Sequence, residues 1–164
     1  MGLKSEVDIL YNAIVNGPSV QLTRYPANAA AAALTASGKT TGAYKYAAAG
    51  ANQVQVVAAA VNTAGMWVCG ASLRNPSAGS IFVLWIGRGT VPAATRLAEL
   101  DFDTFTLAGA AAGALTVMQP MDIMLPLPIF VRAGVGIALD LASSNVGADD
   151  TANGTVIVMT GLGS

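Results

Sequence analysis

A chain of 164 residues with only 17 charged side chains (8 basic and 9 acidic) and 54% hydrophobic residues is poor in charge for its length. An average soluble domain of this size carries about 41 charged residues. The net charge of −1, without a basic run, excludes a surface built to neutralise phosphates, so we expect no nucleic-acid partner. Histidine is absent, which excludes histidine-based catalytic sets and zinc sites. We therefore expect no enzyme activity, no cofactor and no small-molecule substrate.

The shortage of charge indicates that much of the surface is buried against other protein. Residues 47–73 form the longest charge-free run, but Asn, Gln and Gly interrupt it, so no transmembrane helix is expected. Glu6 and Asp8 stand where an export signal would be basic and then apolar, so we expect no export signal, a protein made in the cytoplasm, and no membrane role. Cys69 lies in an apolar run and is expected to be a buried small hydrophobe. Burial against further copies of the chain, or against a partner shell, explains the composition best.

Residues 1–50 are predicted to form an N-terminal arm and an extended docking segment. Over residues 3–15 the spacing of Ser5 and Asp8 resembles a capping box, and Asn16-Gly17-Pro18 is a stop signal, which predicts a short helix of about three turns. This helix packs either on its own domain or on a neighbouring subunit, and the sequence leaves both open. Its candidate contact residues are Ile9, Leu10 and Ile14.

The stretch Val20 to Gly50 has a loop-like composition that is rich in alanine and other small residues. Small side chains lose little entropy on ordering, so the segment can dock in an extended form against a neighbour. Aromatic residues are favoured at such interfaces, although buried structural tyrosines are an equal alternative. The candidate contacts to the shell or to another subunit are Arg24, Tyr25, Tyr44 and Tyr46.

Residues 33–40 resemble the end of a phosphate-binding P-loop, with Ala33 in place of the first glycine and Lys39 in place of the motif lysine. That motif has meaning only after a buried strand and before a helix. The sequence around it favours neither, so we expect no nucleotide binding.

Residues 51–164 are predicted to form an antiparallel β-sandwich of the jelly-roll type, because short strands follow one another without a helical pattern between them. The expected strands are Gln53 to Val61, Met66 to Leu73, Ser80 to Ile86, Thr95 to Leu100, Thr104 to Leu107, Ala114 to Val117, Ile123 to Leu125, Ile129 to Val131, Val135 to Leu141 and Thr155 to Thr160.

Acidic residues alternate with apolar ones over Glu99 to Asp103, which places the three acids on one face of a strand. A solvated sheet face, or a contact to an arginine of another subunit, is favoured over a calcium site. Trp67 and Trp85 both lie within apolar strand runs, which argues against an exposed sugar-binding aromatic group.

The chain is organised around residues 126–142. Pro126 and Pro128 precede a short strand, Arg132-Ala133-Gly134 forms a corner, and apolar residues then alternate from Val135 to Leu141. A polar loop over Ser143 to Gly154 leads to the last strand.

The run Pro128-Ile129-Phe130-Val131-Arg132-Ala133-Gly134, the alternating strand, the polar loop and a last strand ending in Gly161 resemble small jelly-roll head decoration, or cement, proteins of tailed bacteriophages. The run Ser80 to Gly89, before Ala93 to Leu100, adds to the resemblance, which covers about half the chain. It implies a homotrimer on the capsid exterior of the virion that bridges neighbouring major capsid subunits. The alternative from another class is a receptor- or glycan-binding module of a phage fibre or an adhesin.

Overall fold

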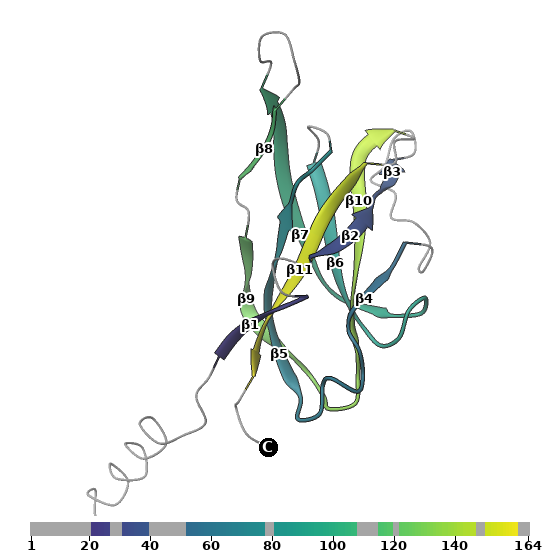
Figure 1. The fold of residues 1–164 in the computed structure, drawn as a ribbon, viewed down its shortest axis with the longest axis vertical. Coiled ribbons are helices and arrows are strands. Elements are labelled where there is room, and N and C mark those ends of the chain that lie inside the picture. The colour runs from purple at the N-terminus through teal and green to yellow at the C-terminus, as the bar shows by residue number, and fades with distance from the viewer. Residues whose placement is uncertain are drawn as a thin grey trace, which may run out of the picture.

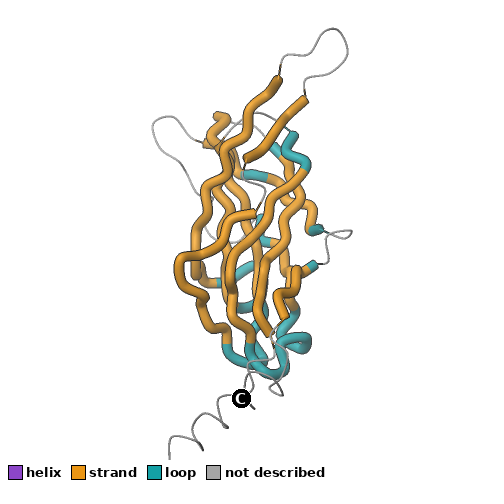
Figure 2. The backbone as a smooth tube through the Cα atoms, turned by 90° about the vertical axis from the view of Figure 1, so that its left-hand side faces the viewer, coloured by secondary structure: helices purple, strands orange, loops and turns teal. Residues whose placement is uncertain are grey.

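The computed structural model describes residues 21–26, 31–39, 52–77, 81–107, 115–119, 122–146 and 150–160. Within these ranges the chain is all β, with eleven strands and no helix. The strands form two sheets that pack together, and most run along the long axis of the molecule (Figures 1 and 2). The predicted all-β sandwich is therefore confirmed, while its jelly-roll connectivity stays a prediction.

One sheet, here sheet A, has the strand order β1-β11-β5-β9, and β2 also pairs with β11. All of its pairings are antiparallel. Its strands are β1 (Gln21–Tyr25), β2 (Ala32–Thr35), β5 (Met66–Arg74), β9 (Asp122–Val131) and β11 (Thr151–Thr160).

The other sheet, sheet B, has the order β3-β10-β6-β7-β8, and β4 also pairs with β10. Its pairings are antiparallel except that of β3 with β10, which is parallel. Its strands are β3 (Ser37–Lys39), β4 (Val54–Val57), β6 (Ile81–Arg88), β7 (Thr95–Leu107), β8 (Leu115–Gln119) and β10 (Ile137–Val146).

The hydrophobic core lies between the sheets and follows the alternation of their strands. On β10, Ile137, Leu139 and Leu141 are buried in the core, as their spacing predicted. Burying a side chain of this size stabilises the fold by about 1.5 to 3 kcal/mol. Other large, fully buried members from the two sheets are Val68, Leu73, Phe82, Leu84, Ile86 and Phe102.

The prediction of a loop over Val20 to Gly50 is wrong for three segments of this stretch, which form the strands β1, β2 and β3. β2 belongs to sheet A and β3 to sheet B, so the chain passes between the sheets at the fully buried Ala36. The backbone N–H of Ala36 donates to the carbonyl oxygen of Asp150 at 2.6 Å. Pairing with β11 and β10 thus overrides the weak strand propensity of this segment. The strands of sheet B come from both sides of the predicted boundary at residue 50.

The two short strands predicted on either side of Pro126 and Pro128 are a single strand, β9. Val68 pairs with Ile129 and Gly70 with Met124, so five steps along β9 oppose two along β5, which leaves three extra residues in β9 as a bulge. β9 is the last strand of its sheet, where a proline without a backbone donor costs little.

The corner after β9 is confirmed. Gly134 has a φ of +73°, which glycine adopts without strain, and its N–H donates to the carbonyl oxygen of Asn62 at 2.7 Å. The corner carries the chain from sheet A to sheet B.

Other strand boundaries in the structure differ from those predicted from the sequence. The strands expected over Thr95 to Leu100 and Thr104 to Leu107 are one strand, β7, and the strand expected from Gln53 reduces to β4. The polar loop expected from Ser143 is shorter, because β10 continues to Val146 and β11 begins at Thr151. The predicted helix over residues 3–15 lies outside the described residues.

Candidate functional site

A row of apolar side chains crosses the outer face of sheet A. The register places Leu22 opposite Met159, Met159 opposite Trp67, and Trp67 opposite Phe130. The residues beside them on β5, β9 and β11 point into the core, so these four point away from it. Leu22 is 63% exposed and Phe130 48% exposed, and the rings of Trp67 and Phe130 lie 5.1 Å apart. We call these four residues the apolar row.

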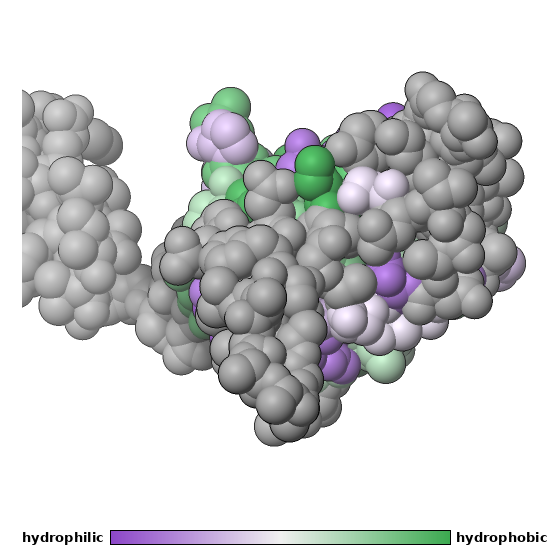
Figure 3. All heavy atoms as spheres, turned by 90° about the horizontal axis from the view of Figure 1, so that it is seen from above, coloured by the Kyte–Doolittle hydropathy of each residue, from purple (hydrophilic) through white to green (hydrophobic). Residues whose placement is uncertain are grey.

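Further exposed apolar surface lies on the edge strand that carries Phe130. Met124 is 50% exposed, and Leu127, within the β9 bulge, is 78% exposed. Seen from above, hydrophobic atoms gather on one side of the described surface (Figure 3). Several large exposed apolar side chains on one sheet are typical of a contact with another protein.

An ion pair joins the two outer strands of the main path of sheet A. Arg24 on β1 donates two hydrogen bonds to the carboxylate of Asp122 on β9, at 3.0 and 2.7 Å. The guanidinium lowers the pKa of Asp122 through these bonds. On β5 and β11, which lie between these strands, the buried hydroxyls of Ser72 and Thr155 hydrogen-bond each other at 2.5 Å. These four charged and polar groups therefore have partners within the chain, and the apolar row lies beside them on the same sheet.

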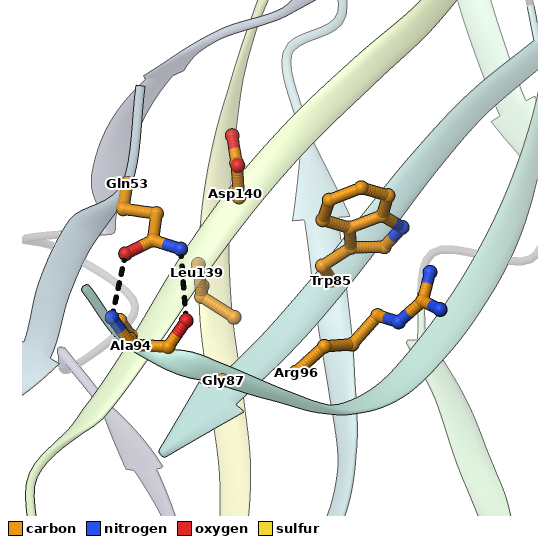
Figure 4. A pocket seen from close by; sticks show the side chains of 8 residues that line it. Gln53, Trp85, Gly87, Ala94, Arg96, Leu139 and Asp140 are labelled. Atoms are coloured by element: carbon orange, nitrogen blue, oxygen red, sulfur yellow. Dashed lines mark hydrogen bonds between the residues drawn. The ribbon is translucent and has the colours of Figure 1, made fainter. Parts of the chain in front are cut away.

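The outer face of sheet B contains a pocket of about 70 Å³ (Figure 4). Trp85 on β6, Arg96 on β7 and Asp140 on β10 line it together with small residues. The guanidinium carbon of Arg96 lies 5.0 Å from the centre of the Trp85 ring, and Arg96 also pairs with Glu99 at 3.0 Å. The strand register builds the site, because Asp140 pairs with Trp85 and Trp85 with Glu99 across three strands.

Two glutamines hold the loop that closes one side of this pocket. The side-chain amide of Gln53 donates to the carbonyl oxygen of Ala94 at 3.1 Å and accepts from its N–H at 3.0 Å (Figure 4). Gln55 donates to three backbone carbonyls, including that of Gly89 at 3.2 Å, and accepts from the N–H of Val91 at 3.1 Å. Sequence reasoning missed both residues, although paired polar side chains within an apolar strand are a sign of buried hydrogen bonds.

Asp140 is the buried acid of the pocket, with an exposure of only 4%. Its Oδ1 accepts a hydrogen bond from the N–H of Leu141 at 2.9 Å, while its Oδ2 has no hydrogen-bond partner. Burial disfavours the charged carboxylate and raises the pKa of Asp140. The alternation of β10 predicted an outward-facing position here, which is correct, but it gave no sign of this burial.

Replacing Asp140 with asparagine is expected to raise the melting temperature near pH 7 by roughly 2 to 4 °C, or about 1 kcal/mol. A raised folded-state pKa contributes stability that is complete below the unfolded value of 3.8 and is lost as the pH rises through the folded value. The gain of Asp140→Asn should therefore be present at neutral pH and vanish near pH 3, which thermal unfolding followed by circular dichroism can measure. Asp101→Asn, at an exposed acid of β7, is the control. An equal effect of Asp140→Asn at both pH values would contradict the expectation.

The structure places some of the predicted contact residues. Arg24 is engaged with Asp122, so a contact of its guanidinium with another subunit would compete with that pair. Tyr25 is half-buried and packs against the chain's own core. Their roles at a shell or subunit contact stay predictions. The remaining candidates lie outside the described residues, namely Ile9, Leu10, Ile14, Tyr44 and Tyr46.

The structure also shows where three other features noted in the sequence lie. Residues 33–39 of the P-loop-like stretch lie mainly on β2 and β3, which pair with β11 and β10, so Lys39 itself lies on a strand and not in a phosphate-binding loop. Glu99 and Asp101 point outward on β7 while Leu100 and Phe102 are buried, as the alternation predicted. Cys69 is buried, as expected, and burial raises the pKa of its thiol.

In the part of the chain that the structure describes, no cluster of three or more His, Cys, Asp or Glu side chains could hold a metal ion. The same residues include no helix able to span a membrane. Comparison with protein-family models, with curated proteins and with solved structures finds no match for this chain.

Proposed function

We propose that this protein is a structural virion protein that assembles as a homotrimer, binds the outside of an icosahedral phage head and cements neighbouring major capsid subunits. The observation that carries the proposal is the apolar row, whose end residues Leu22 and Phe130 are exposed on the outer face of sheet A. A surface of that kind gains free energy when a second protein covers it.

The mechanism that we propose needs no chemical step, cofactor or small-molecule substrate. A protein that binds only the assembled shell stabilises the shell by mass action. A trimer that contacts several capsid subunits at once adds avidity, because its second and third contacts become intramolecular. The low charge of the whole chain is consistent with extensive burial against protein.

The alternative, a receptor- or glycan-binding module, draws on the pocket of sheet B. Trp85, Arg96 and Asp140 are residue types that bind sugars, and the half-buried Trp85 lines the pocket. The volume of about 70 Å³ is small beside the roughly 300 to 1,000 Å³ of typical ligand pockets, which does not favour a sugar ring. A tryptophan fluorescence change on addition of sugars would favour this alternative over the structural role.

The proposal predicts a solution mass of about 49 kDa, three times the 16.4 kDa of one chain, in light scattering. Leu22→Asp places a charge in the apolar row on a side chain that is already 63% exposed, so the chain should still fold. We expect this variant to have a mass near 16.4 kDa and to lose co-sedimentation with phage heads that lack their outer proteins.

The matched control is Ile81→Asp, because Ile81 is an exposed apolar residue of sheet B, 36% exposed, and lies outside the apolar row. This variant should keep both the mass and the binding of the unmodified protein. Equal mass and head binding in the unmodified chain and in Leu22→Asp would overturn the assignment of the apolar row. If the unmodified protein had a mass of about 49 kDa but did not bind phage heads, the shell-binding role would be overturned, while the trimer would still be supported.

A further inference from the structure

A large pocket lies where the edge strand β9 of sheet A meets the end of β6 and the start of β7 in sheet B. Its volume is about 680 Å³, within the roughly 300 to 1,000 Å³ of typical ligand pockets. Arg88 at the end of β6 and Arg132 just after β9 line it, and no acid is among the described residues that do so. We call it the arginine pocket.

The two arginines of this pocket are open to a partner. Both are exposed, and the ion pairs of the described residues, Arg24 with Asp122 and Arg96 with Glu99, include neither of them. Phe130, the last residue of the apolar row, also lines the pocket and is 48% exposed. Exposed apolar surface therefore continues into a positively charged pocket. An occupant that matches it carries an acidic group beside apolar side chains.

One segment of this chain has that chemistry. The helix predicted over residues 3–15 lies outside the described residues, but the sequence gives the sides of such a helix. At about 3.6 residues per turn, Glu6 shares one side with Ile9 and Leu10. Asp8 lies on the opposite side. Glu6 is therefore the acid that accompanies the apolar side chains.

The place where the segment joins the fold puts it near a neighbour that covers the apolar row. Residues 16–20 connect it to β1, whose second residue is Leu22, the other end of the row. Five residues in extended form span about 17 Å. A contact between the segment of one copy and the pocket of the next is head-to-tail, and three such contacts close a ring, as a cyclic trimer requires.

We infer that residues 3–15 of one copy dock in the arginine pocket of a neighbouring copy. Glu6 pairs with the two arginines, and the apolar side of the segment contacts Phe130. A carboxylate between two guanidinium groups forms charge-assisted hydrogen bonds, which fix the orientation of the segment. The inference rests on the proposed homotrimer and names a contact that closes it.

The test is light scattering of the full-length protein over a dilution series. Glu6→Lys, and separately Arg88→Glu combined with Arg132→Glu, should raise the concentration at which the trimer dissociates by about tenfold or more. Each change places like charges against each other. All three substitutions in one chain should restore the behaviour of the unmodified protein, because the charges are again opposite.

The matched control is Asp101→Lys, which makes the same change in net charge as Glu6→Lys at an exposed acid of β7 and should leave dissociation unchanged. The melting temperature of each variant shows that it is folded. A trimer that is indifferent to Glu6→Lys, or more sensitive to Asp101→Lys, would overturn the inference and leave the proposed trimer standing. An unmodified protein that is monomeric would overturn the trimer itself, and the inference with it.

A chain with both Glu6→Cys and Arg132→Cys distinguishes a neighbour's segment from the chain's own. Treatment with a flexible bismaleimide cross-linker should give covalent species of two and three chains, in steps of 16.4 kDa on denaturing electrophoresis. The unmodified chain is the control, because its buried Cys69 should not react. Cross-links confined to single chains would show that each segment occupies its own pocket, which would overturn the inference.

Discussion

Replacing Gly70 with alanine is expected to destabilise the protein by about 3 kcal/mol, at the upper end of the range for overpacking a tight site. A Cβ atom at this position would overlap the backbone carbonyl oxygen of Ile123 and lie 2.9 Å from the Cα of Met124. Both are backbone atoms of β9, so relief requires that the whole strand shift away from β5. The melting temperature should fall by roughly 6 to 12 °C, at about 2 to 4 °C per kcal/mol for a chain of this size.

The control for Gly70→Ala is Gly134→Ala at the corner after β9. Gly134 has a φ of +73°, but an added Cβ there meets no atom within 4 Å. That variant tests conformational strain alone, which costs about 1 to 2 kcal/mol for a residue with a side chain. Urea unfolding of both variants should therefore rank Gly70→Ala as the less stable. The reverse order would mean that β9 moves freely and is not fixed against β5.

The clash at Gly70 also bears on the apolar row. Gly70 lies where the register between β5 and β9 shifts, and the pair Trp67 and Phe130 lies on the other side of that shift. A displaced β9 would move Phe130 relative to Trp67. Gly70→Ala should therefore weaken the proposed assembly even under conditions where the protein remains folded.

Much of the fold could be predicted from local sequence pattern. The alternation from Ile137 to Leu141 identified a strand with one buried face, and Gly134 identified the corner before it. The alternation around Asp101 placed the acids outward. These features depend on residues that are close together in the sequence. An alternation with a period of two reveals such local features, because it shows which side chains of a strand share a face.

The features that were missed depend on contacts between distant parts of the chain. β2 and β3 are short and poor in strand-forming residues, and they exist because β11 and β10 provide backbone partners. The apolar row joins Leu22 to Phe130 through two intervening strands, and only the register reveals it. The burial of Asp140 is likewise a property of the packed sheet face, since its position in the strand predicts only that it points outward.

Replacing Asn62 with alanine is the second change with a large expected effect, a loss of about 3 kcal/mol in the free energy of unfolding. Asn62 is fully buried, and its amide nitrogen donates to the carbonyl oxygens of Arg132 at 2.8 Å and Val135 at 2.9 Å, with a longer contact to Val131 at 3.4 Å. The backbone carbonyl oxygen of Asn62 accepts from the N–H of Gly134. The side chain and the backbone of this one residue thus hold the corner that carries the chain between the sheets. Alanine would remove the side-chain donor from these carbonyl groups, and urea unfolding measures the cost.

The variant Asn62→Asp distinguishes the contribution of the hydrogen bonds to stability from the contribution of packing. Aspartate has nearly the same shape as asparagine but has no N–H donors. The ionised carboxylate would face carbonyl oxygens, so this variant should be at least as unstable as Asn62→Ala near neutral pH. Protonation at low pH supplies one O–H donor and removes the charge, so its deficit relative to the unmodified chain should shrink as the pH falls. The deficit of Asn62→Ala should not change in this way. Parallel behaviour of the two variants across pH would show that Asn62 acts by filling space, and that the corner is held by other contacts.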